Sequence, residues 1–250
     1  MLQGAQGRYD LSELKGFLSD PKVRLLSLSS VEFGSGVRND LDVIGKLCRE
    51  HDVLFCVDAI QSLGCLPLDV SQTPIDFLAA DGHKWMLGCE GCGIFYCRRE
   101  RIPQLRPTTV GWRNVVDSMD FDHYNLELPD DAIRFEEGTP NLPGIFALGA
   151  ALELLLELDV RAIEERVLSL TDQLEEGLHA LGAEILSPRA AGEKSGILSF
   201  QLPGEDPEVT LERLRAKNIF SIVRRGGVRL SPHFYNNEAE NDLLLDALKG

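Results

Sequence analysis

The sequence lacks an excess of positive charge. Its 250 residues contain 25 Lys and Arg against 40 Asp and Glu, which gives a formal net charge of −15 and a pI of about 4.7. A field of this sign repels phosphate backbones and anionic lipid. We therefore expect no nucleic-acid partner and no membrane partner.

The sequence also lacks a long uncharged apolar run. Its most apolar stretch, residues 145–158, contains Glu153 and Glu157. The first residues offer neither the basic part nor the apolar part of a secretory signal. These absences predict no transmembrane segment and a cytoplasmic location.

A disulfide framework is missing as well, although there are six cysteines. Cys48, Cys56 and Cys97 lie inside apolar segments, which fits reduced thiols in the cytoplasm. Cys89 and Cys92 have the C-x-x-C spacing of a zinc ligand pair, and Cys97 follows closely. Because structural zinc usually needs a second pair at a compatible distance, we expect no metal, and zinc binding by these cysteines is the weaker alternative.

The composition is that of an ordinary globular protein. Hydrophobic residues make up 44% and charged residues 26% of the chain, which excludes disordered, collagen-like and coiled-coil proteins. A chain of this length buries a core without help from disulfides or metal. It fits one large domain or two unequal ones, and it contains no internal repeat or low-complexity segment.

The first half of the sequence predicts an α/β fold. Short continuous apolar runs end at polar clusters, and Asn39-Asp40 is a candidate N-cap for a helix through Glu50. Strands that alternate with helices or long crossovers favour a mainly parallel sheet with covered faces. The predicted strands are residues 23–28, 53–57, 75–80 and 94–97.

The second half predicts a smaller α+β domain. Pro140 and Pro143 open a long helical stretch, in which apolar residues recur at steps of three and four up to Leu181. We place the large domain at residues 1–145, and the connecting helix with the small domain at 146–250. Within the small domain we expect strands at 196–202, 219–223 and 228–231 and helices at 208–217 and 238–248.

Two of the predicted strands end in polar residues that could carry chemistry. Asp58 and Gln61 follow one strand, and His83 and Lys84 follow the next. Ligands of open α/β sheets bind beyond the carboxyl ends of parallel strands, so we expect these clusters to face one site. A lysine on a glycine-flanked turn suits Schiff-base chemistry. The alternative is that Asp58 caps a loop and Lys84 is solvated.

Five segments together carry a family resemblance, and they occur in order along most of the chain. The sequence resembles the class V branch of the fold-type I pyridoxal-phosphate enzymes, the aminotransferase and cysteine-desulfurase-like family. The resemblance implies a large cofactor-binding domain, a small α+β domain and pyridoxal 5′-phosphate as cofactor. The segments are VDAIQS at 57–62, DGHKW at 81–85, GCEGCGIFY at 88–96, RFEEGTPNLPGI at 134–145 and VRLSPHFYNNEAE at 228–240.

The resemblance assigns four residues to the cofactor. Lys84 is implied as the catalytic lysine that holds pyridoxal phosphate as a Schiff base and moves a proton at the substrate Cα. Asp58 is implied to pair with the pyridine nitrogen, so that the ring accepts electrons. Gln61 is implied to bind the phenolic oxygen, and His83 to contact the phosphate or the ring. The alternative for His83 is a satisfied buried histidine.

The resemblance assigns two more residues to the substrate and to a partner subunit. Arg229 matches the arginine that grips the α-carboxylate of an amino acid or keto acid, and its alternative is a surface salt bridge. Thr139 resembles a residue that reaches the cofactor phosphate of the other subunit, which implies a homodimer. Trp85 and Phe135 are interpreted as packing aromatics.

The sequence departs from the family at two places. The family has a substantial segment ahead of the position of Arg8, with a phosphate-binding turn and a ring-stacking aromatic, so we expect an N-terminally truncated chain with weaker cofactor retention. Between Lys217 and Arg229 there is no cysteine to accept sulfur as persulfide. We therefore predict a class V aminotransferase. The alternatives are a cysteine-desulfurase-like enzyme, a carbon–sulfur lyase or an epimerase of this family, and a non-catalytic truncated remnant that self-associates.

Overall fold

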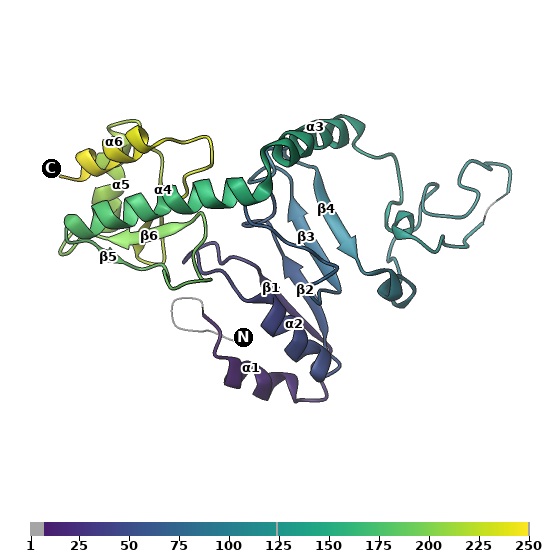
Figure 1. Cartoon of the computed structure of the whole chain (residues 1–250). Coiled ribbons are helices and arrows are strands. Elements are labelled where there is room, and N and C mark those ends of the chain that lie inside the picture. The colour runs from purple at the N-terminus through teal and green to yellow at the C-terminus, as the bar shows by residue number, and fades with distance from the viewer. Residues whose placement is uncertain (1–7, 124, 250) are drawn as a thin grey trace.

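Two β-sheets organise the chain in the computed structural model, which describes residues 8–123 and 125–249 (Figure 1). The first sheet has the order β1-β2-β3-β4. β1, β2 and β3 run parallel, and β4 pairs antiparallel with β3. The prediction of an α/β fold with a mainly parallel sheet is confirmed. The strands are β1 (Leu25–Ser29), β2 (Leu54–Asp58), β3 (Phe77–Asp81) and β4 (Gly93–Cys97).

Two helices accompany the first sheet, and each begins at an aspartate. α2 (Leu41–Glu50) starts at Asp40, whose Oδ1 accepts a hydrogen bond from the backbone N–H of Val43 at 3.0 Å. The predicted N-cap is therefore confirmed. α1 (Leu11–Leu18) begins in the same way at Asp10, and the sequence reasoning missed this helix.

The long helical stretch after Pro140 is two helices and not one. α3 (Leu142–Leu158) and α4 (Val160–Ala180) are separated by a single residue, Asp159. Its φ of +67° cannot continue an α-helix. Its carboxylate then accepts from the N–H of Arg161 at 3.0 Å and so caps α4. The apolar periodicity continues across this break, which is why the sequence pattern did not reveal it.

The second sheet is antiparallel and has the order β5-β6-β8-β7. The predicted α+β arrangement is confirmed, and the last helix has the predicted bounds. β5 was not predicted, because its two residues are too few to form a pattern. The elements are β5 (Glu184–Ile185), β6 (Leu198–Gln201), α5 (Pro207–Arg215), β7 (Ile222–Arg224), β8 (Gly227–Leu230) and α6 (Glu238–Leu248).

Each sheet has its own hydrophobic core. Phe55 and Val57 are central to the first core, and Phe200 and Leu214 to the second. α4 contributes to both, with Ile163 and Val167 in the first and Leu174 and Leu178 in the second. We define the first region as residues 8–97 and the second region as residues 184–249. The predicted domain boundary after residue 145 stays a prediction.

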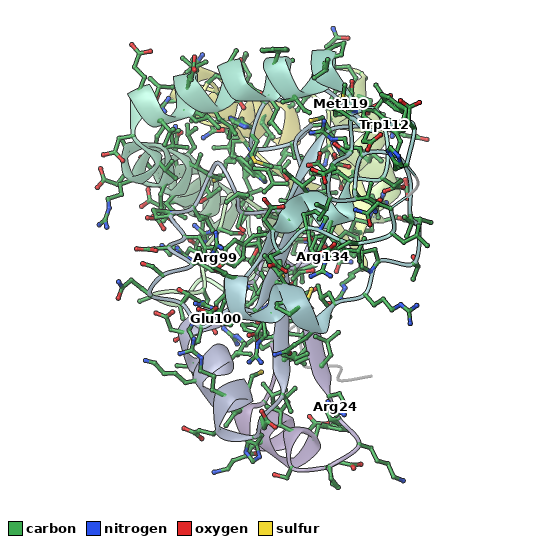
Figure 2. The ribbon with its side chains drawn as sticks, turned by 90° about the vertical axis from the view of Figure 1, so that its right-hand side faces the viewer. Arg24, Arg99, Glu100, Trp112, Met119 and Arg134 are labelled. Atoms are coloured by element: carbon green, nitrogen blue, oxygen red, sulfur yellow. The ribbon has the colours of Figure 1, made fainter. Side chains whose placement is uncertain are left out.

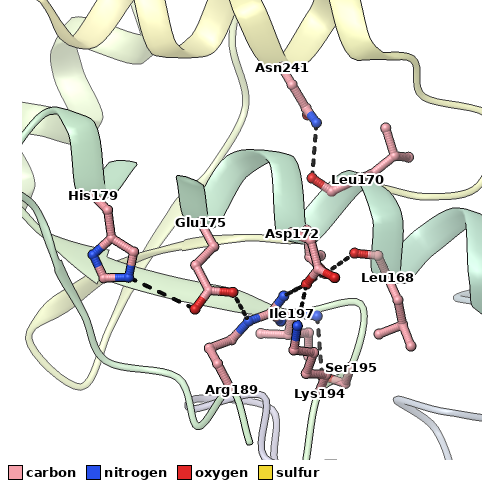
Figure 3. Close-up of polar contacts among 11 residues, drawn as sticks. Leu168, Leu170, Asp172, Glu175, His179, Arg189, Lys194, Ser195, Ile197 and Asn241 are labelled. Carbon is pink, nitrogen blue, oxygen red and sulfur yellow. Dashed lines mark hydrogen bonds and ion pairs between the residues drawn. The ribbon is translucent and has the colours of Figure 1, made fainter. Parts of the chain in front are cut away.

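A network of charged side chains fixes the segment after β5 to α4 (Figure 3). Arg189 has a side chain that is only 8% exposed, and it pairs with Asp172 and Glu175 of α4. Lys194 adds a contact to Asp172 at 2.8 Å. Asp172 and Glu175 lie one turn apart on α4, so the network attaches residues 189–194 to this helix at two successive turns.

The segment between β4 and α3 has little regular structure. It contains two short 3-10 helices, η2 (Arg99–Gln104) and η3 (Ala132–Phe135). Figure 2 faces this segment and shows Trp112 and Met119 on it. Several of its large apolar side chains are exposed, including Trp112, Met119, Phe121 and Leu126.

Among the described residues, no helix combines the length and the apolar character needed to cross a bilayer. All six cysteines are free thiols. In the same part of the chain, no group of three or more His, Cys, Asp and Glu side chains is arranged to hold a metal ion.

Candidate active site

Lys84 lies in a closed loop at the carboxyl end of β3, residues 82–92, which we call the lysine loop. The loop leaves and returns at Gly82, whose N–H donates to Cys92 O and whose carbonyl accepts from Gly88 N–H, both at 2.8 Å. A Cβ at Gly82 would lie 2.7 Å from Cys92 O, and one at Gly88 would lie 2.8 Å from Leu148 Cδ1. The glycines that flank the lysine are therefore needed for this close packing.

The surroundings of Lys84 lower the pKa of its amine. The residue is half-buried. Burial is the main cause that lowers its pKa below the usual value, and the positive charge of Arg229 acts in the same direction. The carboxylates of Asp58 and Asp81 oppose this shift. This partial burial does not favour the alternative that Lys84 is simply solvated, and its role in the cofactor site stays a prediction.

Asp58 occupies the end of the neighbouring strand. It is the last residue of β2, in register with Ser29 of β1 and Ala79 of β3. Its Oδ1 accepts from the N–H of Ile60 at 3.0 Å, so it does cap the following turn. Gln61, in that turn, is 6% exposed. The polar clusters after β2 and β3 thus lie at one edge of the sheet, as predicted.

His83 is accessible, and it faces a carboxylate. Its Nδ1 lies 3.4 Å from Asp81 Oδ2, and its side chain is 30% exposed. The alternative of a satisfied buried histidine is therefore wrong.

Arg229 enters the site from the second sheet. It lies on β8, and its Nε and Nη2 both donate to Ser231 Oγ, at 3.2 and 3.1 Å. Burial lowers the pKa of Arg229, with a smaller contribution from Arg224. In the part of the chain that the structure describes, no carboxylate lies within 4 Å of its guanidinium. The surface salt bridge, which was the alternative for Arg229, is therefore wrong.

His233 is a residue of this site that the sequence reasoning missed. Its ring stacks on Trp85, the neighbour of Lys84, with centroids 4.7 Å apart. It is 9% exposed, its Nε2 has no hydrogen-bond partner among the described residues, and burial lowers its pKa to about 4. A Cβ at Gly196 would also clash with Trp85. The second region therefore packs directly on the residue that follows the lysine.

Trp85 and Phe135 are packing aromatics, as predicted. Trp85 is 5% exposed, and Phe135 makes an edge contact with Phe95, with ring centroids 5.8 Å apart. The signal for His233 was present in the segment at 228–240. The sequence alone does not distinguish the histidine, because it gains its partner Trp85 only when the two regions pack together.

Thr139 is exposed and is not brought next to Lys84 by any hydrogen bond of the described residues. It precedes Asn141, which caps α3. The Nδ2 of Asn141 donates to Gly91 O at 3.1 Å, so this segment is attached to the part of the chain between Lys84 and β4.

The zinc alternative gains no support from the cysteines. Cys89 is exposed on the lysine loop, whereas Cys97 is at the end of β4. The thiol of Cys97 contacts the carbonyl of Arg98 at 3.6 Å.

A mainly parallel sheet with a lysine loop at its carboxyl edge, and an antiparallel sheet that supplies an arginine, define a protein of the pyridoxal-phosphate transferase fold class. A family model described as aminotransferase class-V matches residues 2–242. This chain belongs to that family, whose cofactor is pyridoxal phosphate. The predicted family resemblance is confirmed.

Two curated relatives illustrate the similarity. A probable cysteine desulfurase of Pyrococcus abyssi is 29% identical over 98% of this chain and 63% of its own length. An uncharacterized aminotransferase of Bacillus subtilis, YcbU, is 27% identical over 99% of this chain and 65% of its own length.

Two solved structures show the same fold. The apo structure of a cysteine desulfurase from Thermococcus onnurineus NA1 gives a TM-score of 0.90 at 28% identity, over 100% of this chain and 64% of that one. The cystine C-S lyase C-DES, in complex with its product cysteine persulfide, gives a TM-score of 0.86 at 28% identity, over 95% of this chain and 63% of that one. The chain thus spans less than two thirds of the length of these relatives.

Proposed function

We propose that this chain binds pyridoxal phosphate at Lys84 and transforms an amino acid. The observation that carries the proposal is the position of Lys84. It is a half-buried lysine on a closed loop, with a lowered pKa, and the charges of both Asp58 and Arg229 act on it. Such a lysine is suited to covalent chemistry, because only the neutral amine is a nucleophile.

The side chains at the sheet edge suit the cofactor. Oδ1 of Asp58 is used by the backbone, whereas Oδ2 has no protein donor among the described residues. It could therefore accept a hydrogen bond from a pyridinium N–H. When bound, pyridoxal phosphate supplies an electron sink for the electron pair that remains when a bond to the substrate Cα breaks. Gln61 and His83 would bind the phenolic oxygen and the phosphate or ring.

Lys84 and Arg229 have separate tasks in this proposal. Arg229 would bind the substrate carboxylate through its planar fork, and Ser231 orients that fork by accepting from two of its nitrogens. Lys84 would first hold the cofactor and then move a proton at Cα, which its lowered pKa favours.

We also propose that the working unit is a homodimer. Thr139 is exposed on the segment attached to the lysine loop, so it is available to a second copy rather than to Lys84 of its own chain. The exposed apolar side chains of this segment and of α3 support an interface on the same side. A cytoplasmic location belongs to the proposal too, and the six free thiols support it.

The reaction we favour is transamination between an amino acid and a keto acid. No cysteine occurs after Cys97, so the second region offers no thiol to accept sulfur. The second candidate is carbon–sulfur bond cleavage, because cysteine desulfurases and the C-S lyase C-DES are among the similar proteins. Incubation with amino donors and keto acids distinguishes the two, since transamination yields a new amino acid and cleavage yields sulfide or persulfide.

The first test is to map the cofactor attachment. The purified chain is incubated with pyridoxal phosphate, reduced with borohydride and digested, and the modified peptide is identified by mass spectrometry. We expect a single adduct on Lys84 and none in Lys84→Ala. Labelling scattered over many lysines, or a single adduct that persists in Lys84→Ala, would contradict the proposal.

The matching test concerns Arg229. Arg229→Ala should keep the adduct on Lys84 but weaken amino-acid binding by tenfold or more, because a charge-assisted bidentate contact is lost. Arg215→Ala, an exposed arginine at the end of α5, removes the same charge and serves as control.

A further inference from the structure

The hairpin that carries Arg229 contains two more arginines. Arg224 ends β7, and Arg225 and Gly226 form the turn before β8. This chain has a net charge of −15, and many of its other arginines are paired with carboxylates. Yet in the described part of the chain, no carboxylate lies within 4 Å of Arg224, Arg225 or Arg229.

The strand register places two of these arginines on one face of the sheet. Ile222 of β7 pairs with Arg229 of β8, and Arg224 pairs with Gly227. Residues two apart on a strand share a face, so Arg224 lies on the same face as Arg229, on the diagonal. At this spacing long side chains can reach a common ligand. The two guanidinium groups are close enough for their charges to interact, because Arg224 contributes, after burial, to lowering the pKa of Arg229.

The third arginine leans from the hairpin onto the first region. Arg225 has a φ of +50°, so the turn is tight. Its Cδ and Nε lie 3.1 Å from the position of a Cβ at Gly34. Gly34 belongs to the loop that continues β1, and the last residue of β1 is in register with Asp58. Arg225 is therefore at the carboxyl edge of the first sheet, where the lysine loop also lies.

An acidic group on this side, Glu32, already has a hydrogen-bond partner. Glu32 Oε1 accepts from the hydroxyl of Tyr9 at 3.0 Å. Burial, followed by the charge and hydrogen bond of Glu32, raises the pKa of Tyr9 to about 12, and Arg225 opposes this shift. Arg225 is thus close to this pair without forming an ion pair with Glu32. One arginine is enough for one α-carboxylate, which leaves Arg224 and Arg225 without a partner.

We propose that Arg224 and Arg225 bind a second negative group on the substrate, so that the site selects amino acids or keto acids with an acidic side chain. The distal group would be a carboxylate, sulfinate or sulfonate. This inference rests on the proposed function, because it takes Arg229 as the site of the α-carboxylate. Guanidinium groups bind all three oxyanions through paired N–H donors.

The test compares a dianion with a monoanion. Binding of succinate and of propionate to the full chain is measured by ligand-observed NMR, at constant ionic strength in a buffer without phosphate or carboxylate. We expect succinate to bind about tenfold more tightly than propionate or better. Arg224→Gln and Arg225→Gln should each lower this preference, and the double variant should abolish it while propionate binding stays. Arg215→Gln is the control of equal charge change.

Three results would overturn the proposal. They are equal binding of both probes to the unmodified chain, a preference that survives the double variant, and inorganic phosphate that competes as well as succinate does, since the cluster would then be a general anion site. The borohydride experiment separates this proposal from the cofactor proposal. A missing Lys84 adduct with an intact succinate preference contradicts only the cofactor proposal, and the reverse result contradicts only the acidic-substrate proposal.

Discussion

The two regions have four strands each, but they bury their apolar surface differently. The sheet of the second region shares one core with α5 and α6 and with the preceding α4, and α6 begins with a capping box at Asn237. In the first region Phe95 of β4 is 50% exposed, and in α3, which lies outside this region in the sequence, Phe146 and Leu156 are 75% and 72% exposed. Apolar surface of this extent is typical of a face that another chain or segment covers. The sheet of the second region is thus packed by helices of this chain, although Phe220 and Leu243 stay exposed, whereas beside the lysine exposed apolar side chains lie on β4 and α3.

The largest loss of stability should come from removing a central aromatic ring in either core. Phe55 and Phe200 are both fully buried, and Phe→Ala in a core costs about 3–5 kcal/mol. If the regions have separate cores, Phe200→Ala should lower hydrogen-exchange protection chiefly in residues 198–230. Phe55→Ala should lower it chiefly in residues 25–81.

Hydrogen exchange followed by mass spectrometry measures both sets of amides in one experiment. Equal losses in both regions for both variants would mean that the chain unfolds as one cooperative unit, and the contrast between the two regions would then fail.

The second effect is a pH dependence that belongs to the contact between the regions. His233 has a pKa of about 4 in the folded chain against about 6.5 when unfolded. Above pH 6.5 both states are neutral and the residue contributes nothing. Between pH 6.5 and 4 the unfolded state takes up the proton, so the free energy of unfolding falls as the pH falls, by ~3 kcal/mol in all.

His233→Phe keeps a ring against Trp85 but cannot be protonated. Denaturant titrations at pH 7, 5.5 and 4.5 should show a smaller loss of stability for His233→Phe than for the parent chain. Identical pH profiles would show that His233 is not buried as a neutral side chain.

The third effect is a loss of stability at a contact between the two regions, where Gly36 packs against Ile197. Gly36 has a φ of +74°, and a Cβ there would lie 2.5 Å from Ile197 O. Its carbonyl also accepts from Ser195 Oγ at 2.6 Å. Gly36→Ala should therefore cost about 2 kcal/mol or more, from backbone strain and a clash that cannot relax through a side chain.

Gly149→Ala is the matched control for this effect. Gly149 lies in α3 with no atom near its Cβ position, so alanine should stabilise the helix by about 0.5–1 kcal/mol. Thermal unfolding of both variants checks the opposite signs. A neutral Gly36→Ala would place the contact between the regions elsewhere.

The smallest effect tests a helix that belongs to the first region alone. Asp40→Ala removes the N-cap of α2 and should cost about 1 kcal/mol. Asp42→Ala removes the same charge from the first turn without removing a cap, and should cost only a few tenths. Urea unfolding compares the two, and equal losses would show that charge and not the cap hydrogen bond matters.

Much of the fold could be predicted because its strands are continuous apolar runs. The centres of β1, β2, β3 and β4 are correct because each is a continuous apolar run, although β1 and β4 are not covered on both faces. The antiparallel direction of β4 is a tertiary property that the run does not encode. The break at Asp159 was missed because a single residue with positive φ does not change the periodicity on either side of it.

The site residues also fall into those that the sequence could place and those that it could not. Lys84 and Asp58 could be placed at one edge, because both follow strands of a parallel sheet. His233 and Arg225 could not be found by the same reasoning, since their contacts to Trp85 and Gly34 join segments more than a hundred residues apart. Only the folded chain brings those groups together.

α4 has a mechanical consequence. Its 21 residues, at 1.5 Å each, make a rod of about 30 Å. Ile163 and Val167 near its start pack in the core that contains Trp85, and Leu174 and Leu178 near its end pack in the core of the second sheet. One continuous helix therefore spans from the core beside the lysine to the core of the sheet that carries Arg229.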